Sequence, residues 1–229
     1  MEVGYAAVKG TRWRSRDRVD LGAAGVAGDR RWCLVDVEAR RVLRTIAHPA
    51  LMSLAPDPRP TPTGEQVTCD YWGRPVDLAL VDDPFAATAS DLVGRPVRLA
   101  EAPPGAVVYG AGVSVVATGS LAAVDPGAGP SAEPARFRPS VVVDAGEAFA
   151  EERWLGAQVR LGSAVVRLTT LTPRCAVVDH HPVTGERDRP LLRRMVEQRG
   201  DPGTGPTFGL DGDVVVPGVV VPGDVVGLA

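Results

Sequence analysis

Short apolar runs rich in valine, broken by glycine and proline, recur along the whole chain. Runs of this length with alternating apolar and polar positions are typical of half-buried strands, and the glycine and proline between them indicate tight turns. Valine outnumbers leucine two to one, and β-branched side chains suit a pleated surface. The expected strands cover residues 31–37, 40–46, 66–71, 75–81, 97–100, 113–117, 141–144, 158–161, 164–170 and 176–179, with several more in 213–227.

Three segments have helical features. Residues 84–93 begin with a proline and are followed by Gly94, which suits the start and the end of a helix. In residues 190–199 the apolar side chains fall on one helical face, and Gly200 follows as a cap. Residues 147–153 predict a single helical turn. The fold class is therefore mainly β with a few helices (α+β).

Two proline- and glycine-rich segments punctuate the second half of the chain. Residues 101–109 contain Pro103-Pro104-Gly105 and predict a junction, so we expect one unit at 1–104 and another at 105–229. Residues 125–134 predict a flexible loop.

Composition and charge exclude several classes of protein. The chain has 26 glycines and 21 prolines, but 45% of its residues are hydrophobic and its net charge is only −3, which favours a globular chain with many turns over a disordered one. The slight acidity gives no electrostatic reason to expect nucleic acid as a partner. No apolar run approaches the ~18–20 residues of a membrane helix, and the first ten residues lack the apolar core of a secretory signal. We expect no membrane association and a cytoplasmic location.

The three cysteines and three histidines form none of the common structural sites. The cysteines are odd in number and far apart, with no C-x-x-C pair, and the histidines have no metal-binding spacing. A disulfide scaffold and a structural zinc site are therefore not expected. The basic residues, in contrast, have one distinctive feature, because Lys9 is the single lysine among 25 basic residues.

The segment Thr172-Pro173-Arg174-Cys175 carries the strongest chemical indication. It follows an alternating strand, so Cys175 lies at or just past a strand end. The positive charge of Arg174 favours the thiolate, which is both the nucleophilic and the metal-ligating form of cysteine. The alternative is a buried cysteine that acts as a small hydrophobic residue.

Two arginine pairs are candidate anion sites. Arg136 and Arg138 are two residues apart and share a side if the segment is extended, and arginine forks suit phosphate. Arg30 and Arg31 likewise lead into a predicted strand. The alternatives are an exposed pair on a loop for the first, and pairing with Asp29 for the second.

The order of several motifs resembles the MOSC domain, which is named after the C-terminal part of molybdenum cofactor sulfurase. The motifs are RFRPSVVVD (136–144), EAFAEERW (147–154), TPRC (172–175), TGE (184–186), FG (208–209) and PGD (222–224). Upstream, GDRRWCLVD (28–36) resembles the MOSC N-terminal β-barrel module of the amidoxime-reducing component family. The resemblance implies a MOSC-type β-barrel preceded by a smaller MOSC N-terminal β module.

The same resemblance implies a molybdenum cofactor and its site. Cys175 would ligate molybdenum through its thiolate, which agrees with the preference of such metals for soft sulfur ligands. Basic and hydroxyl side chains would hold the phosphate of the pterin. By position these are Lys9, Arg30, Arg31, Thr118, Ser120, Arg136, Arg138, Ser140 and Arg174. Gly10, in place of the family's usual Ser or Thr, and Ser140, in place of its usual Asn, depart from the pattern.

Three functions remain open from the sequence. The first is a molybdenum-dependent oxidoreductase that reduces small N-hydroxylated or N-oxide compounds. It would take electrons from a separate ferredoxin or flavin reductase type protein, since the chain has no cysteine cluster for an iron–sulfur centre. The second is a sulfur carrier or transferase with a persulfide on Cys175. The third is a molybdopterin-binding module without catalysis.

Overall fold

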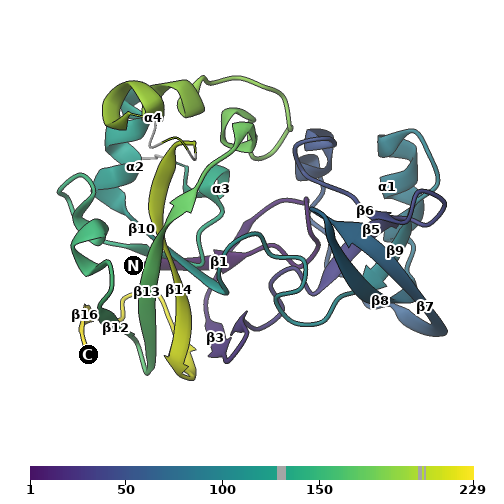
Figure 1. The fold of residues 1–229 in the computed structure, drawn as a ribbon, viewed down its shortest axis with the longest axis horizontal. Helices are drawn as coiled ribbons and strands as arrows, with labels where there is room; N and C mark the ends of the chain where they lie inside the picture. Colours follow the sequence, from purple (N-terminus) through teal and green to yellow (C-terminus); the bar gives the residue numbers. More distant parts are fainter. Residues whose placement is uncertain (128–132, 201–202, 204) are drawn as a thin grey trace.

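The fold contains a closed five-stranded barrel, seen at the right of Figure 1. The computed structural model describes residues 1–127, 133–200, 203 and 205–229. Apolar side chains from alternate strand positions, with Tyr71 the largest of them, fill the barrel. The helix α1 (Phe85–Val93) and the short 3-10 helix η1 (Pro49–Ser53) pack together outside it. The barrel strands are β5 (Trp32–Asp36), β6 (Arg41–Val42), β7 (Thr61–Tyr71), β8 (Arg74–Asp82) and β9 (Arg98–Glu101).

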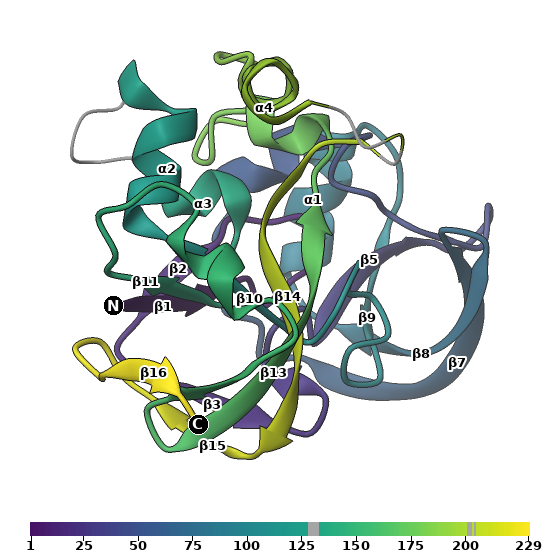
Figure 2. The ribbon, with the colours of Figure 1, turned by 60° about the vertical axis from the view of Figure 1, so that its left-hand side comes forward.

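The remaining strands form two sheets that share one apolar core. The larger sheet has the order β16-β12-β13-β14-β10-β11-β1-β2, and the smaller has the order β15-β3-β4. The long strands β13 and β14 run side by side through both views (Figures 1 and 2). The strands are β1 (Glu2–Tyr5), β2 (Arg14–Arg16), β3 (Val19–Gly22), β4 (Gly25–Val26), β10 (Val113–Ala117), β11 (Val141–Val143), β12 (Gln158–Leu161), β13 (Ala164–Pro173), β14 (Thr207–Val216), β15 (Gly218–Val220) and β16 (Val226–Leu228).

Helices gather at one end of the larger sheet, as Figure 2 shows for α2, α3 and α4. Their apolar side chains form a second cluster with Phe137, Phe208 and Met195 at its centre. These helices are α2 (Thr118–Val124), α3 (Pro134–Phe137) and α4 (Leu191–Arg199), together with the 3-10 helices η3 (Ala150–Trp154) and η4 (Ala176–Asp179). No helix within the described residues is long and apolar enough to cross a membrane.

The N-terminal strands join the sheets of the C-terminal half, not the barrel. Strand β1 pairs with β11 and β2, and β3 pairs with β15. Strand pairing therefore crosses the predicted division between 1–104 and 105–229, which stays a prediction. The pairing has a direct consequence for the site, because it places residues 6–12, in the connection between β1 and β2, between the larger sheet and the barrel.

The expected fold class, mainly β with a few helices, is confirmed, and so are most of the expected elements. The hairpin around Trp72-Gly73 and the helices at 84–93 and 190–199 are present. The predicted loop 125–134 lies partly outside the described residues, and Pro134 begins α3.

Two local expectations are wrong. Residues 176–179 form the 3-10 helix η4 and not a strand, because Cys175 O accepts from Val178 N and the carboxylate of Asp179 accepts from Leu192 N. These local and helix-capping bonds replace strand pairing. Residues 40–46 contribute only Arg41–Val42 to a strand.

Candidate functional site

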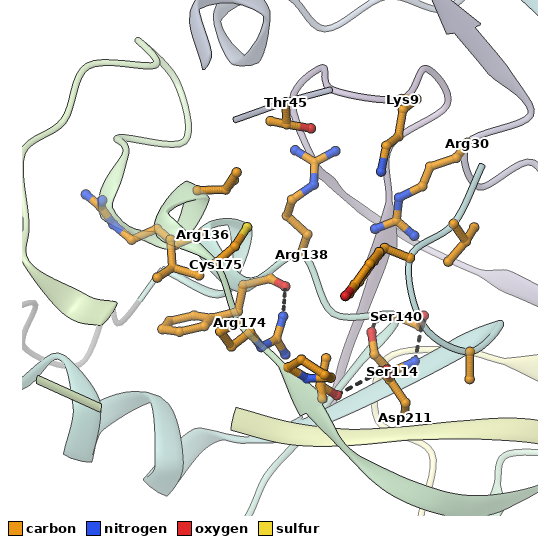
Figure 3. A pocket seen from close by; sticks show the side chains of 18 residues that line it. Lys9, Arg30, Thr45, Ser114, Arg136, Arg138, Ser140, Arg174, Cys175 and Asp211 are labelled. Carbon is orange, nitrogen blue, oxygen red and sulfur yellow. Dashed lines mark hydrogen bonds between the residues drawn. The ribbon is translucent and has the colours of Figure 1, made fainter. Parts of the chain in front are cut away.

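A cavity of about 150 Å³ lies between the connection that follows β1 (residues 6–12), residues next to the barrel, and the end of β13 (Figure 3). It is formed by segments far apart in the sequence. Those with polar or reactive side chains at its wall are Lys9, Arg30, Thr45, Tyr109, Ser114, Arg136, Arg138, Ser140, Thr172, Arg174, Cys175 and Asp211.

Lys9, Arg30 and Arg138 point toward one another at one side of the cavity, beside Thr45 (Figure 3). Arg138 Nη1 donates to the carbonyl of Thr11 over 2.6 Å, whereas its buried Nη2 has no hydrogen-bond partner among the described residues. Arg30 is paired with Asp29, at 2.5 Å. The three cations thus face one another with a single carboxylate partner, and one buried N–H group is left for a ligand.

Burial and neighbouring positive charges lower the pKa values of two residues of this cluster, Lys9 and Arg138. Burial, reinforced by the charges of Arg30 and Arg138, lowers the pKa of Lys9 to about 7. Burial and then Arg30 lower the pKa of Arg138 to about 10. Like charges in a partly desolvated site disfavour the charged forms, and a bound anion reverses that effect. The cluster could therefore hold an anion.

Cys175 is exposed and lines the same cavity, immediately after β13. Cys33 and Cys69 are buried, and burial raises the pKa of each of those thiols. Cys175 is thus the one cysteine of the chain that a ligand can reach.

Arg174 directly precedes Cys175, and each nitrogen of its guanidinium donates a hydrogen bond to a backbone carbonyl. Its Nε and Nη2 donate to the carbonyl of Phe208 over 2.9 and 2.7 Å, and its Nη1 donates to the carbonyl of Phe137 over 2.7 Å. Burial lowers its pKa to about 10. Arg174 therefore supplies positive charge beside the thiol while its donors hold the backbone.

Arg136 and Arg138 point in different directions, because the segment is not extended, which was the condition for the two side chains to share a side. Arg136 lies in α3, and Arg138 follows it in the left-handed conformation (φ 54°), which turns the chain between them. The guanidinium of Arg136 is fully buried and forms two hydrogen bonds with Asp188, of 2.7 and 2.6 Å. It also donates to the carbonyl of His180. Its donors are thus used within the protein.

Three other predicted site residues are not brought to the cavity wall. The guanidinium of Arg31 forms an exposed ion pair with Glu101. The Thr118 hydroxyl accepts from Ala145 N, and the Ser120 hydroxyl donates to Glu151 while accepting from Phe149 N. Ser140 does reach the wall, where its hydroxyl accepts from Ser114 N.

The structure adds site residues that the sequence analysis did not identify. Thr45 and Tyr109 line the cavity from connecting segments. Asp211 is buried in β14, accepts from the Thr172 hydroxyl over 2.8 Å, and has a pKa raised by burial. A carboxylate that follows the apolar residues Phe208 and Leu210 was the available indication for Asp211.

A family model for the MOSC domain matches residues 106–227, more than half of the chain. The chain belongs to the MOSC domain family. This family is associated with molybdenum cofactor binding. No protein of established function matches the chain in sequence.

Among solved structures similar to this MOSC protein, that of YuaD agrees with its fold. The YuaD protein from Bacillus subtilis has 14% identity and a TM-score of 0.51, with 98% of this chain and 91% of that chain covered. A hypothetical protein has 12% identity and a TM-score of 0.45, with 99% of this chain covered. YiiM from Geobacillus stearothermophilus has 18% identity and a TM-score of 0.39, with 52% of this chain covered. The MOSC protein spans 65% of the hypothetical protein and 54% of YiiM.

The residues of the cavity fit the phosphate and metal ends of a molybdenum cofactor. A phosphate dianion needs several charge-assisted donors, and Arg138 Nη2 is a buried donor without a partner. A metal held by a soft ligand needs an accessible thiolate, which Cys175 can supply. The Arg138 donor and the Cys175 thiol line one cavity. Lys9 and Arg30 lie next to the Arg138 donor, and Arg174 lies next to Cys175.

Proposed function

We propose that this MOSC protein binds the molybdenum cofactor in the cavity and is a molybdenum-dependent oxidoreductase. A single observation carries the proposal. The unpartnered donor of Arg138, the crowded charges of Lys9 and Arg30, and the exposed thiol of Cys175 line the same cavity of about 150 Å³. One ligand with an anionic end and a thiolate-ligated metal end satisfies all of them.

At the anionic end, Lys9, Arg30 and Arg138 would hold the phosphate. Its charge replaces the repulsion among the three cations with attraction, so that Lys9 is held as an ammonium and donates to the ligand. The Thr45 hydroxyl, which lies beside them, completes the polar wall. These groups orient the cofactor and exclude water from its phosphate.

At the metal end, Cys175 would provide a thiolate ligand. The three backbone hydrogen bonds of Arg174 keep the strand end before Cys175 in place. When bound, the cofactor supplies a two-electron redox centre. A free thiol of this kind is kept in a reducing compartment, and we propose the cytoplasm.

The proposed substrates are small N-hydroxylated or N-oxide compounds. Reduction of an N–OH group consumes two electrons and two protons, breaks the N–O bond and releases water. The electrons would come from a separate protein of the ferredoxin or flavin reductase type. Solvent at the open side of the cavity, where Cys175 is exposed, can supply the protons.

Metal and pterin analysis of protein purified from a cofactor-producing host tests the proposal. We expect molybdenum and pterin near one per chain in the wild type. Cys175→Ala should lose molybdenum and Arg138→Met should lose both, whereas the matched controls Cys69→Ala and Arg153→Ala should retain both. Full molybdenum in Cys175→Ala would overturn the assigned ligand, and loss in the controls alone would overturn the assigned site.

The exposure of Cys175 also supports sulfur transfer as a second candidate function. Incubation with a cysteine desulfurase and cysteine, followed by mass spectrometry, should then add the mass of one sulfur atom to Cys175. Protein that contains molybdenum and gains no such adduct would exclude sulfur transfer in favour of the oxidoreductase.

A further inference from the structure

A second cavity of about 200 Å³ opens directly in front of Cys175. It shares Lys9, Thr45, Tyr109 and Cys175 with the cofactor cavity. Its lining also includes Trp72 and Arg44, which do not line the cofactor cavity. We call this second cavity the mouth of the site, since a molecule that approaches Cys175 from solvent passes these side chains.

Trp72 adopts a backbone conformation that its residue type disfavours. It occupies the two-residue turn between β7 and β8 with φ 55°, and Gly73 follows with φ 78°. Turns with two positive φ values strongly favour Asn, Asp or Gly, and a bulky residue there is an outlier. Conformations of this kind cluster at ligand sites, where the strain persists because the side chain is needed.

The exposure of the aromatic rings is the second observation. The side chain of Trp72 is 46% exposed and that of Tyr109 is 60% exposed, although both are large apolar groups. Their ring centroids lie 5.6 Å apart at an interplanar angle of 54°. Two exposed rings that converge on a reactive thiol form a platform for a third planar ring, since aromatic groups stack at these separations.

Arg44 places a positive charge next to the two aromatic rings. Its guanidinium lies over the Trp72 ring, 4.6 Å from the centroid, and it forms no ion pair among the described residues. An arginine stacked on an aromatic ring keeps its planar fork free for a carboxylate or a similar anion.

We propose that the mouth selects a planar aromatic substrate that carries an acidic group. The ring lies against Trp72 and Tyr109, the acidic group is held by Arg44, and the reducible N–O group points toward Cys175. A cavity of about 150 Å³ holds a benzene molecule, so the mouth has room for one ring with its substituents. The inference rests on the proposed function, because it names the substrate class of that same site.

Three amidoximes of similar size test this selection with the molybdenum-loaded protein and a small artificial electron donor. They are 4-carboxybenzamidoxime, benzamidoxime and cyclohexanecarboxamidoxime, of which the last has no planar ring. We expect KM to rise in that order.

The variants separate the two contacts. Trp72→Ala should raise KM about three- to tenfold for the two aromatic compounds, leaving kcat and the cyclohexyl compound unchanged, while Trp72→Phe keeps most of the affinity. Arg44→Ala should raise KM about two- to fivefold for the carboxylated compound alone, and Arg44→Lys should retain it. Leu155→Ala, which truncates an exposed side chain elsewhere, is the control.

The outcomes distinguish the two proposals. Equal KM values for the three compounds would overturn the selectivity of the mouth and leave the oxidoreductase standing. An equal loss with every compound in Trp72→Ala would also overturn it and indicate a general effect on the site. If no compound is turned over, fluorescence titration with 1-naphthoate decides: binding that weakens in Trp72→Ala and in Arg44→Ala supports the mouth, and unchanged binding overturns it.

Discussion

Arg174 and Phe208 are joined side chain to backbone, since two guanidinium nitrogens of Arg174 donate to the same carbonyl of Phe208, over 2.9 and 2.7 Å. The third donor reaches the carbonyl of Phe137. The guanidinium lies 5.7 and 5.8 Å from the centroids of the two phenylalanine rings, which themselves contact at 4.4 Å. One side chain thus ties β14 and α3 to the residue before Cys175.

Replacement of Arg174 should therefore destabilise the fold as well as the site. Arg174→Ala leaves two carbonyl groups without these charge-assisted donors, and we expect the free energy of unfolding to fall by about 2–4 kcal/mol. Arg174→Lys, with a compact ammonium in place of the fork, should give an intermediate loss. Urea unfolding measures both. Arg153→Ala, which removes an exposed ion pair with Glu147 and a long hydrogen bond to the carbonyl of Ala150, is the control, and equal midpoints for it and Arg174→Ala would contradict the role.

The lowered pKa of Lys9 predicts proton uptake when an anion binds. At about pH 8 Lys9 is largely neutral, because its pKa is about 7 in the free protein. A dianion beside it raises the pKa, so the ammonium forms on binding. Sulfate is a suitable probe because it does not titrate in this range.

Calorimetry of sulfate binding in two buffers of different ionisation enthalpy measures that uptake. Uptake should be clear near pH 8 and vanish below about pH 6, where Lys9 is already charged. Lys9→Met should abolish it. Because Lys9 is the single lysine, uptake that persists in Lys9→Met would assign the proton to another group.

The Arg136–Asp188 pair predicts a loss of stability that depends on pH. Hydrogen bonds from Arg136 hold the pKa of Asp188 below its ordinary value of 3.8. A carboxyl with a lowered pKa stabilises the fold above its unfolded-state pKa, and this contribution is lost as the pH falls through the folded-state value. Arg136→Met should cost about 2–3 kcal/mol at neutral pH, less than a fully buried pair, because Asp188 remains partly exposed.

Unfolding of both proteins across the acid range checks this assignment. The difference between wild type and Arg136→Met should shrink as the pH falls from 3.8 through the lower pKa of Asp188 in the folded wild type, below which Asp188 is protonated in both proteins. Arg193→Ala, which removes an exposed pair with Glu197, should change little at any pH. A difference that is constant with pH would show that Asp188 is not the group involved.

The sequence pointed to the cysteine and the cationic side chains that line the cavity, but not to the other residues of its lining. The motif around Cys175 and the resemblance led to Cys175, Lys9, Arg30 and Arg138, all of which line the cavity. The direction of Arg136 could not be read from its spacing, because the left-handed turn at Arg138 depends on how α3 packs.

Other residues of the site depend on the fold itself. Thr45 and Tyr109 lie in connecting segments without a motif, and they reach Cys175 only because the barrel and the sheets lie side by side. The strand expected at 176–179 failed for a related reason. The apolar pattern of Val177 and Val178 suits a strand, but Asp179 caps α4 and holds the segment in a 3-10 turn.

Gly209 gives the last prediction, since it allows β14 to approach β10 next to Arg174. Its φ is 78°, and a Cβ added to it would lie 2.7 Å from the carbonyl oxygen of Val115 and 3.5 Å from Arg174 Nη2. Gly209→Ala therefore has two costs, the left-handed backbone, about 1–2 kcal/mol, and displacement of the β10 backbone. Gly94→Ala is the matched control, because Gly94 has φ 77° and open space where a Cβ would lie. Urea unfolding should show a clearly larger loss for Gly209→Ala, together with reduced molybdenum content, since the shift reaches Arg174 and with it Cys175. Equal losses for the two variants would mean that the close approach at Gly209 adds nothing beyond the backbone conformation.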